Sequence, residues 1–211
     1  MVELGGTSIL SETTEFIGAE HILARRGKTK EISDRIYQIV HDYEHAIKLV
    51  GHDIREGNPS PGNKKGGISS LEDKSLGCTQ KSGSAPVMGV LSYGEPVKEK
   101  GLNLLSAPGN DLVASTALAA SGAHIVLFTT GRGTPFASPV PTVKISTNNQ
   151  LAKKKQNWID FNCGVMVNDT PLDELSENLL DFVLEIASGK KSKSEEAGFH
   201  DMAIFKQGVT L

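Results

Sequence analysis

The chain has 211 residues, and its 22 Lys and Arg against 25 Asp and Glu give a formal net charge of −3. No basic excess is available to bind a phosphate backbone, and only 5% of the residues are aromatic, so the composition argues against a nucleic-acid-binding protein. Hydrophobic residues make up 38% of the chain, which suits an ordinary water-soluble core.

Cysteine content and hydropathy narrow the class of protein further. Two cysteines, Cys78 and Cys163, are too few for a disulfide framework or a four-cysteine zinc site. No run of residues approaches the roughly 18 apolar positions that span a bilayer. The first six residues, MVELGG, lack the pattern of a secretory signal. We therefore expect a cytoplasmic protein that does not act at a membrane.

The first predicted strand, Thr7–Leu10, leads into an acidic segment, SETTEFIGAEH, and a short helix at Ala19–Arg25. Glu12, Glu15 and His21 in this segment supply carboxylates and an imidazole, which suit Fe²⁺, Mn²⁺ or Mg²⁺. Their spacing matches no strong metal template. Exposed charges near the start of a helix are the alternative interpretation.

A long helix is predicted over Lys28–Val50, because eight apolar residues recur at steps of 3, 4 and 1 and lie on one arc. Gly51 stands where a left-handed residue would end it. His41 and His45 are spaced to bind a metal from one helical face. Both lie opposite the apolar arc, so we interpret them as solvent-exposed instead.

The stretch Gly51–Gly67 is rich in Gly and Pro and has no apolar periodicity, so we expect an ordered loop at a site, with a disordered linker as the alternative. Asn63, Lys64 and Lys65 in this loop suit the capture of an anion; a solvated turn is the alternative. A short helix is expected next, at Leu71–Ser75. The segment LGCTQKSG that follows offers Lys81 to a polyhydroxylated substrate, whereas its Cys78 is interpreted as a small buried residue.

Strands are predicted at Pro86–Leu91 and Leu102–Leu105, and the second is followed by the turn SAPGND and a helix over Asn110–Ser121. Amide groups after Gly109, at the start of this helix, would attract a carboxylate or phosphate. The alternative interpretation is that Asn110 or Asp111 simply caps the helix. Because one cap residue is enough, the other would be free to face a ligand or a metal.

A mostly apolar run, Ala123–Thr129, is predicted to be a strand buried on both faces, and the loop TTGRGTPF follows it. Gly131 and Gly133 let a ligand approach the backbone, Arg132 offers a planar fork for a carboxylate, and Thr134 adds a hydroxyl. A tight turn with a solvent-facing Arg132 is the alternative. Loops after parallel strands share one edge of a sheet, so the loops Asn58–Gly67, Pro108–Asp111 and Gly131–Thr134 are expected to converge on one crevice.

The remaining predicted elements complete an α/β pattern. Val143–Ser146 is a strand candidate, Leu172–Ala187 an amphipathic helix between Pro171 and Gly189, Lys190–Glu196 a solvated charge cluster, and Ala203–Phe205 a last short strand. Alternating strands and helices predict a single layered α/β domain over residues 1–211, with a mainly parallel sheet flanked by helices.

Several long segments, taken together, resemble a known family: ILSETTEFIGAEHIL, GNPSPGNKKGGISSLEDKSLGCTQKSG, LLSAPGNDLVASTALAASG, IVLFTTGRGTPFASPVPTVKISTN and WIDFNCG. They look like the carboxy-terminal domain of the altronate dehydratase and galactarate dehydratase family, and LEDKSLGCTQKSGSAPV looks most like its altronate branch. The resemblance runs from about Leu4 to Leu211. It implies that this chain is a fragment or one half of a split enzyme, which lacks a small β-rich amino-terminal domain and a preceding catalytic segment.

The resemblance implies a hydro-lyase of carbohydrate acid catabolism and hexuronate degradation that depends on Fe²⁺ or Mn²⁺. Altronate would be dehydrated to 2-dehydro-3-deoxygluconate. Galactarate dehydration, release of sulfite from sulfolactate, and mere binding of a sugar acid are the alternatives. We expect partnership with the missing amino-terminal portion, a homo-oligomer, and little activity from the isolated chain.

The chemistry of dehydration divides the candidate residues into catalytic, metal-binding and substrate-binding groups. Removing a proton next to a carboxylate and expelling a hydroxyl needs a base, an acid and cations around a dianionic intermediate. The catalytic candidates are Glu12, Glu15, Lys65, Asp111 and Arg132. The metal candidates are Glu12, His21 and Asp111. The substrate-binding candidates are Asn63, Lys64, Lys81, Gly109, Asn110, Gly131, Gly133 and Thr134.

Overall fold

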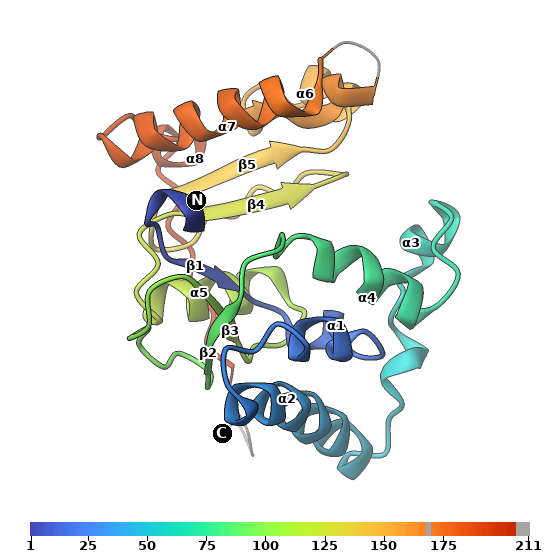
Figure 1. Cartoon of the computed structure of the whole chain (residues 1–211). Coiled ribbons are helices and arrows are strands. Elements are labelled where there is room, and N and C mark those ends of the chain that lie inside the picture. The colour runs from blue at the N-terminus through green and yellow to red at the C-terminus, as the bar shows by residue number, and fades with distance from the viewer. Residues whose placement is uncertain (168–169, 206–211) are drawn as a thin grey trace. The chain divides into compact units, whose positions relative to one another are not determined.

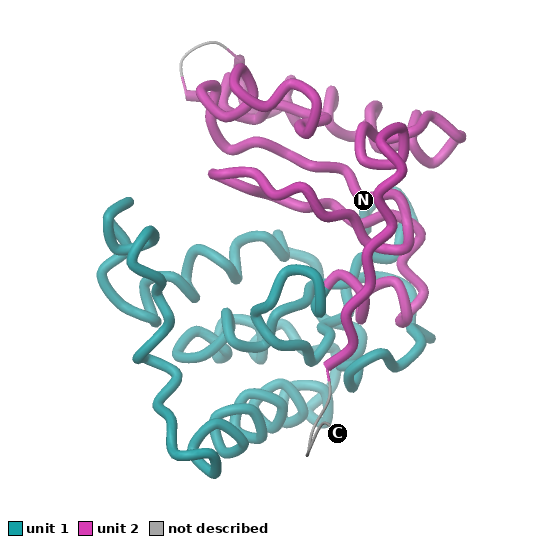
Figure 2. Tube along the Cα trace, turned by 180° about the vertical axis from the view of Figure 1, so that it is seen from behind, with its two compact units in different colours: residues 1–114 teal, residues 115–211 magenta. Residues whose placement is uncertain are grey.

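The computed structural model describes residues 1–167 and 170–205, which form two compact units, Met1–Ala114 and Ser115–Leu211 (Figure 2). Each unit contains a three-stranded parallel sheet with helices packed on it, which confirms the predicted α/β class. The expected single sheet is thus replaced by two. A single domain over the whole chain stays a prediction.

The first unit is built on a sheet whose strands lie in the order β1-β3-β2 (Figure 1). Its elements are η1 (Val2–Leu4), β1 (Ser8–Leu10), η2 (Thr13–Glu15), α1 (Glu20–Ala24), α2 (Lys30–Leu49), η3 (Ile54–Glu56), α3 (Pro61–Lys65), α4 (Leu71–Gln80), β2 (Val87–Leu91) and β3 (Leu102–Leu105). The helix α5 (Asp111–Ala120) begins in this unit and continues into the second.

The long helix α2 packs one apolar face on this sheet, as its periodicity predicts. Ile36, Ile39 and Val40 are buried in a core that includes Leu102 and Leu104 of the central strand. The Thr29 hydroxyl accepts a hydrogen bond from the amide of Ile32 at 3.4 Å and so caps the start of the helix. At the other end Gly51 has φ +79°, a left-handed conformation that favours glycine.

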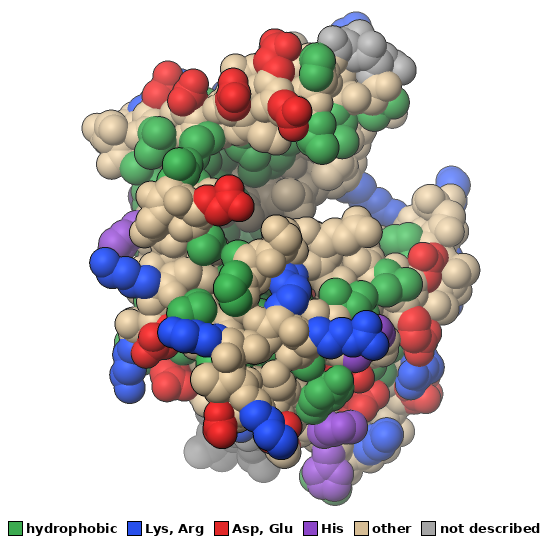
Figure 3. Space-filling model, in the orientation of Figure 1, with side chains coloured by type: hydrophobic (Ala, Val, Ile, Leu, Met, Phe, Trp, Pro, Cys, Tyr) green, Lys and Arg blue, Asp and Glu red, His purple; other side chains and the backbone are tan. Residues whose placement is uncertain are grey.

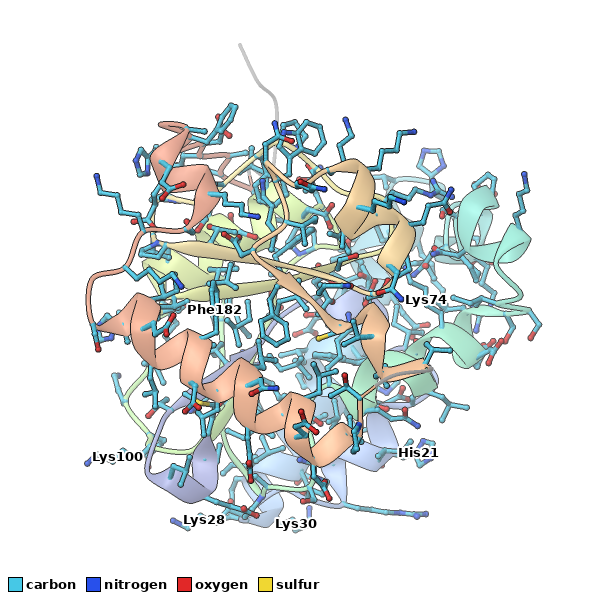
Figure 4. All side chains as sticks on the ribbon, turned by 90° about the horizontal axis from the view of Figure 1, so that it is seen from above. His21, Lys28, Lys30, Lys74, Lys100 and Phe182 are labelled. Atoms are coloured by element: carbon cyan, nitrogen blue, oxygen red, sulfur yellow. The ribbon has the colours of Figure 1, made fainter. Side chains whose placement is uncertain are left out.

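The second unit contains a sheet in the order β4-β5-β6. Its elements are β4 (Val126–Thr130), β5 (Thr142–Ser146), α6 (Asn149–Lys154), β6 (Phe161–Asn162), η4 (Cys163–Val167), α7 (Leu172–Ala187) and α8 (Lys193–Glu196). Phe182 and Ile186 of α7 pack with Val143 and Ile145 of β5, and Figure 4 labels Phe182 on the side of this helix that faces the strands. The acidic side chains of α7 face solvent, as Figure 3 shows along the top of the view.

The prediction that Ala123–Thr129 is a strand buried on both faces is wrong. It contributes β4, which lies at the edge of the sheet, where Leu127 is 44% exposed. The central strand is β5, and all five of its residues are buried, including Lys144 at 1% exposure. Position in the sheet, rather than apolar content, decides which strand is covered on both faces.

Four other local predictions need correction. The Gly51–Gly67 stretch contains η3 and α3 rather than only loop, and α4 continues well beyond Ser75 to Gln80. Part of the Lys190–Glu196 cluster is ordered as α8, because Ser192 forms a capping box with Glu195. Ala203–Phe205 forms no strand; the amide of Ala203 donates instead to the Thr116 hydroxyl at 3.1 Å.

Candidate active site

Two candidate segments meet where neighbouring parallel strands of the first unit end. β1 and β3 pair directly, so the acidic segment after β1 and the turn after β3 leave the same edge of the sheet. The amide of Thr13 donates to the carbonyl of Ala107 at 2.9 Å, and the Thr13 hydroxyl accepts from the amide of Ala107 at 3.2 Å. The two segments are therefore fixed to each other by one backbone–backbone hydrogen bond and one between a backbone amide and a side chain.

Glu12 adopts an unusual backbone conformation at this edge. Its φ is +76°, and among the residues described it is the one non-glycine residue with a positive φ. A side chain in this region costs of order 1–3 kcal/mol and persists where surrounding structure enforces it. Such strain is concentrated at functional sites, which singles out Glu12 within the acidic segment.

The Glu15 carboxylate lies at the centre of a cluster of polar side chains. Lys74 Nζ lies 2.9 Å from Oε1, the Cys78 thiol donates to Oε2 at 2.6 Å, and Lys81 Nζ lies 3.6 Å from Oε2. The Glu15 side chain is only 13% exposed. We call Glu12, Glu15, Lys74, Cys78 and Lys81 the Glu15 cluster.

One face of α4, continued by Lys81 at its carboxyl-terminal cap, supplies the three partners of Glu15. Lys74, Cys78 and Lys81 follow one another at i, i+4 and i+7, a spacing that stacks side chains on a single helical face. Sequence reasoning selected Lys81 but missed Lys74 and set Cys78 aside as a small buried residue. A predicted helix that continued past Ser75 would have placed all three side chains on one face, so their i, i+4, i+7 spacing is the sequence signal that reveals them.

The two carboxyl groups of the cluster are held in opposite protonation states. Burial, reinforced by the neighbouring Glu15 carboxylate, raises the pKa of Glu12 to about 8. Burial acts in the same direction on Glu15, but Lys81, the thiol of Cys78 and Lys74 outweigh it and lower the pKa of Glu15 to about 2. At neutral pH Glu12 is therefore mainly a protonated acid beside an ionised Glu15.

The other titratable groups follow the same electrostatics. Burial, followed by the charge of Glu15, raises the pKa of Cys78 to about 12, so its thiol stays a hydrogen-bond donor. Burial and Glu15 also raise the pKa of Asp111. Burial lowers the pKa of Lys81, but the surrounding anionic groups reverse this and leave it raised, so Lys81 remains a cation.

In the turn after β3, Asn110 has a structural role, whereas Asp111 is exposed. Asn110 Oδ1 accepts from the amide of Val113 at 3.2 Å, so Asn110 caps α5 and Asp111 is left exposed at the start of the helix. A side chain at Gly109 would lie 2.7 Å from Thr14 Oγ1, so only glycine fits there without displacing Thr14. The structure thus brings Asp111 and the amides after Gly109 to the edge of the sheet that carries Glu12.

The Asn58–Gly67 segment reaches the Glu15 cluster through Lys74. Asn58 Oδ1 accepts from Lys74 Nζ at 2.9 Å, and Lys74 also contacts Glu15. Asn63 Oδ1 accepts from the amide of Ser60 at 3.2 Å in the capping box of α3, so this oxygen has a structural role. Lys64 and Lys65 are exposed on the last turn of α3, available to solution.

The Arg132 loop belongs to the second unit. The Thr130 hydroxyl accepts from the amides of Arg132 and Gly133 at 3.4 and 2.9 Å, and Gly133 has φ +82°. The carbonyl of Gly131 accepts from Asn148 Nδ2 at 3.0 Å, which joins the loops after β4 and β5. Arg132 is exposed and Thr134 half-buried. Convergence of this loop with the two loops of the first unit stays a prediction.

The described residues do not fit a divalent metal. Within residues 1–167 and 170–205, no three His, Cys, Asp or Glu side chains are grouped to hold a metal ion. Two ammonium groups already neutralise Glu15, and a metal cation beside them would be repelled. His21 is exposed on α1, and Figure 4 shows it well apart from Lys74. Glu12, His21 and Asp111 are therefore not assembled as ligands by this part of the chain.

The histidines set aside as solvent-exposed are confirmed as such. His41 and His45 are both exposed on α2, and Figure 3 shows histidine side chains at the surface in this region. His41 Nδ1 lies 4.0 Å from Glu44 Oε2, at the limit of an ion pair. Of the helices described, none is long and apolar enough to cross a membrane.

Comparison with known proteins defines the family. Residues 1–210 match the model of the carboxy-terminal domain of D-galactarate and altronate dehydratases, and the chain belongs to this family. It is 51% identical to the altronate dehydratase of Bacillus subtilis (strain 168) over 212 residues, 100% of this chain and 42% of that protein. The altronate dehydratase of Escherichia coli (strain K12) is also 51% identical, over 98% of this chain and 42% of its own length.

A more distant relative has a different named substrate. The galactarate dehydratase (L-threo-forming) of Escherichia coli (strain K12) is 36% identical over 97% of this chain and 40% of its own length. The chain thus spans about two fifths of the length of these relatives. The resemblance found in the sequence is confirmed, with the altronate dehydratases more similar than the galactarate dehydratase.

Proposed function

We propose that the complete protein dehydrates a sugar acid, most specifically D-altronate to 2-dehydro-3-deoxy-D-gluconate and water. The observation that carries this proposal is the paired carboxyl groups of Glu12 and Glu15, one protonated and one ionised at neutral pH. Two carboxyl groups whose surroundings move their pKa values apart are a recurring feature of acid–base sites, and here the charge of Glu15 helps to keep Glu12 protonated. The higher identity to altronate dehydratases supports the choice of substrate.

Glu12 is assigned the role of the general acid. A pKa near 8 is close to the operating pH, where proton transfer by a positioned side chain is most effective. Its proton would pass to the departing hydroxyl, which leaves as water. Asp111, exposed at the start of α5 with a raised pKa, is the carboxylate assigned to take the proton next to the substrate carboxylate.

Cationic and amide groups would stabilise the anionic intermediate. Lys81 stays charged beside the cluster, Lys64 and Lys65 are exposed on α3, and the amides after Gly109 lie at the start of α5. Hydrogen bonds from charged donors to a carboxylate are among the strong ones in proteins. Arg132 would add a two-pronged contact to the substrate carboxylate.

The metal expected from the family resemblance needs ligands that the described residues do not assemble, so the proton transfers are assigned to side chains alone. Fe²⁺ or Mn²⁺ in the complete enzyme stays a prediction, as do a homo-oligomer and a cytoplasmic location. Dialysis of the complete enzyme against a chelator, with activity restored by one metal and not by others, would identify the requirement.

The test is a substrate panel with the complete enzyme. Aldonates, aldarates and sulfolactate are incubated anaerobically with Fe²⁺, and release of a 2-keto acid or of sulfite is measured. Formation of 2-dehydro-3-deoxygluconate from altronate supports the proposal. Turnover of galactarate or sulfolactate alone would reassign the substrate, and binding without any turnover would favour a domain that only binds sugar acids.

The isolated chain of 211 residues should show little or no dehydratase activity. The relatives are more than twice as long, and the metal has no ligand group within the described residues. The measurement compares altronate turnover by this chain with turnover by the complete enzyme at equal concentration. Full turnover by the isolated chain would refute the expectation.

Arg132→Ala in the complete enzyme should lower kcat/KM about ten- to hundredfold. The change removes a charge-assisted contact to the substrate carboxylate worth roughly 1.5–3 kcal/mol. His41→Ala, on the exposed face of α2, is the control and should leave kcat/KM unchanged. An unchanged kcat/KM in Arg132→Ala would remove this loop from the site.

A further inference from the structure

Glu15 is held by more groups than neutralising its charge requires. Each carboxylate oxygen has its own partner from α4: Lys74 Nζ at 2.9 Å from Oε1, and the Cys78 thiol at 2.6 Å from Oε2. Lys81 lies farther away, at 3.6 Å, and supplies charge rather than a short contact. Lys74 and Cys78 therefore fix both the position and the rotation of the carboxylate plane.

The two partners also differ from ordinary surface contacts. The Lys74 side chain is 19% exposed and Cys78 is 9% exposed, so water competes little for either contact. Lys74 makes a second contact, to Asn58 Oδ1 at 2.9 Å, which restricts its own side chain. A donor that is itself restricted holds its acceptor more firmly than a free surface lysine does.

We propose that Lys74 and Cys78 are positioning residues, which hold the Glu15 carboxylate in one position and orientation beside Glu12. This proposal rests on the proposed function, because it takes Glu12 as the general acid and the ionised Glu15 as the neighbour that keeps it protonated. Neither Lys74 nor Cys78 touches the substrate in this proposal. Each acts through Glu15, and the nucleophilic chemistry of the thiol is not used.

The structural consequence of losing either partner is specific. Without the thiol, Oε2 keeps only the distant Lys81, and the carboxylate is free to rotate about its last torsion. Without Lys74, Oε1 has no remaining contact among those described for the cluster. In both cases the carboxylate leaves the orientation that Glu12 requires, while substrate-binding groups elsewhere are unchanged. The effect should therefore fall on kcat rather than on KM.

Cys78 is tested in the complete enzyme with its altronate substrate. Cys78→Ala removes the donor and should lower kcat about ten- to hundredfold, with KM within about twofold of wild type. Cys78→Ser keeps a short donor at the same position and should restore most of kcat. Cys163→Ala, at the other cysteine, is the matched control and should leave kcat unchanged. The thermal midpoint of each variant verifies that it is folded.

Lys74 is tested by the same comparison. Lys74→Met keeps the length of the side chain without the ammonium and should lower kcat by a similar factor, whereas Lys74→Arg should retain part of it. Lys30→Met, at an exposed lysine of α2, is the matched control. Equal loss in Cys78→Ala and Cys78→Ser, or a loss confined to KM, would overturn positioning in favour of a packing role. Wild-type enzyme that dehydrates no sugar acid would instead overturn the proposed function.

Discussion

Glu12→Gln in the complete enzyme should lower kcat by about 10²- to 10⁴-fold, the range that a positioned general acid contributes. Glutamine keeps the size and polarity of the side chain but has no proton to give to the departing hydroxyl. The measurement is steady-state turnover of altronate at neutral pH. Glu3→Gln, which changes an exposed glutamate of η1, is the matched control and should retain full activity. A Glu12→Gln enzyme within threefold of wild type would remove Glu12 from the chemistry.

The same substitution has a consequence for stability that does not depend on turnover. Burial raises the pKa of Glu12 from the reference of 4.5 to about 8, so the folded state holds this proton more tightly than the unfolded state does. The resulting stabilisation is fully present below pH 4.5 and is lost as pH rises through about 8. Glutamine does not ionise, so Glu12→Gln should become more stable than wild type above pH 8. Urea unfolding at pH 8.5 checks this sign.

Much of the fold follows from short-range patterns in the sequence. The eight apolar positions of the Lys28–Val50 segment predict α2, and its core contacts through Ile36, Ile39 and Val40 confirm the buried face. The short apolar runs that became β1 and β3 are also predictable. The pairing of β1 with β3 is not predictable in this way, because these strands are more than 90 residues apart in the sequence and their pairing depends on the whole sheet.

Prediction failed where tertiary packing overrides local preference. The β5 segment, TVKIS, contains a lysine and so does not look like the centre of a sheet, yet Lys144 is 1% exposed. The end of α4 was missed because Gly77, Cys78 and Thr79 are poor helix formers. That error in length hid the helical face on which Lys74 and Cys78 lie.

The candidate site was predicted in part for the same reasons. Glu12, Glu15, Lys81 and Asp111 stand out as charged residues that follow strands or lie among glycines, and the structure groups them electrostatically. Residue types alone do not reveal which carboxylate is protonated. That depends on burial, on the positive φ of Glu12 and on three partners of Glu15, all of which are properties of the folded chain.

Gly164 is a further position whose importance is visible only in the folded chain. It lies in η4, where an added Cβ would lie 2.6 Å from Asn148 Cα and closer still to the carbonyl carbon of Asn148 and the amide nitrogen of Asn149. These are backbone atoms, so no side chain can rotate away. Asn148 also caps α6 through the amide of Leu151 at 2.8 Å and donates to the carbonyl of Gly131 at 3.0 Å.

Gly164→Ala should therefore destabilise the second unit by about 3 kcal/mol, at the upper end of what overpacking costs. This loss corresponds to a thermal midpoint roughly 6–12 °C lower. Gly57→Ala is the matched control, because nothing lies within 4 Å of its added Cβ and its φ of −113° suits alanine. Since Asn148 is bonded to Gly131, the Arg132 loop should shift as well, so Gly164→Ala enzyme that remains folded should also lose affinity for the sugar acid. An unchanged midpoint would show that the backbone at Asn148 yields without cost, and the close approach at Gly164 would then have no role in holding the loop.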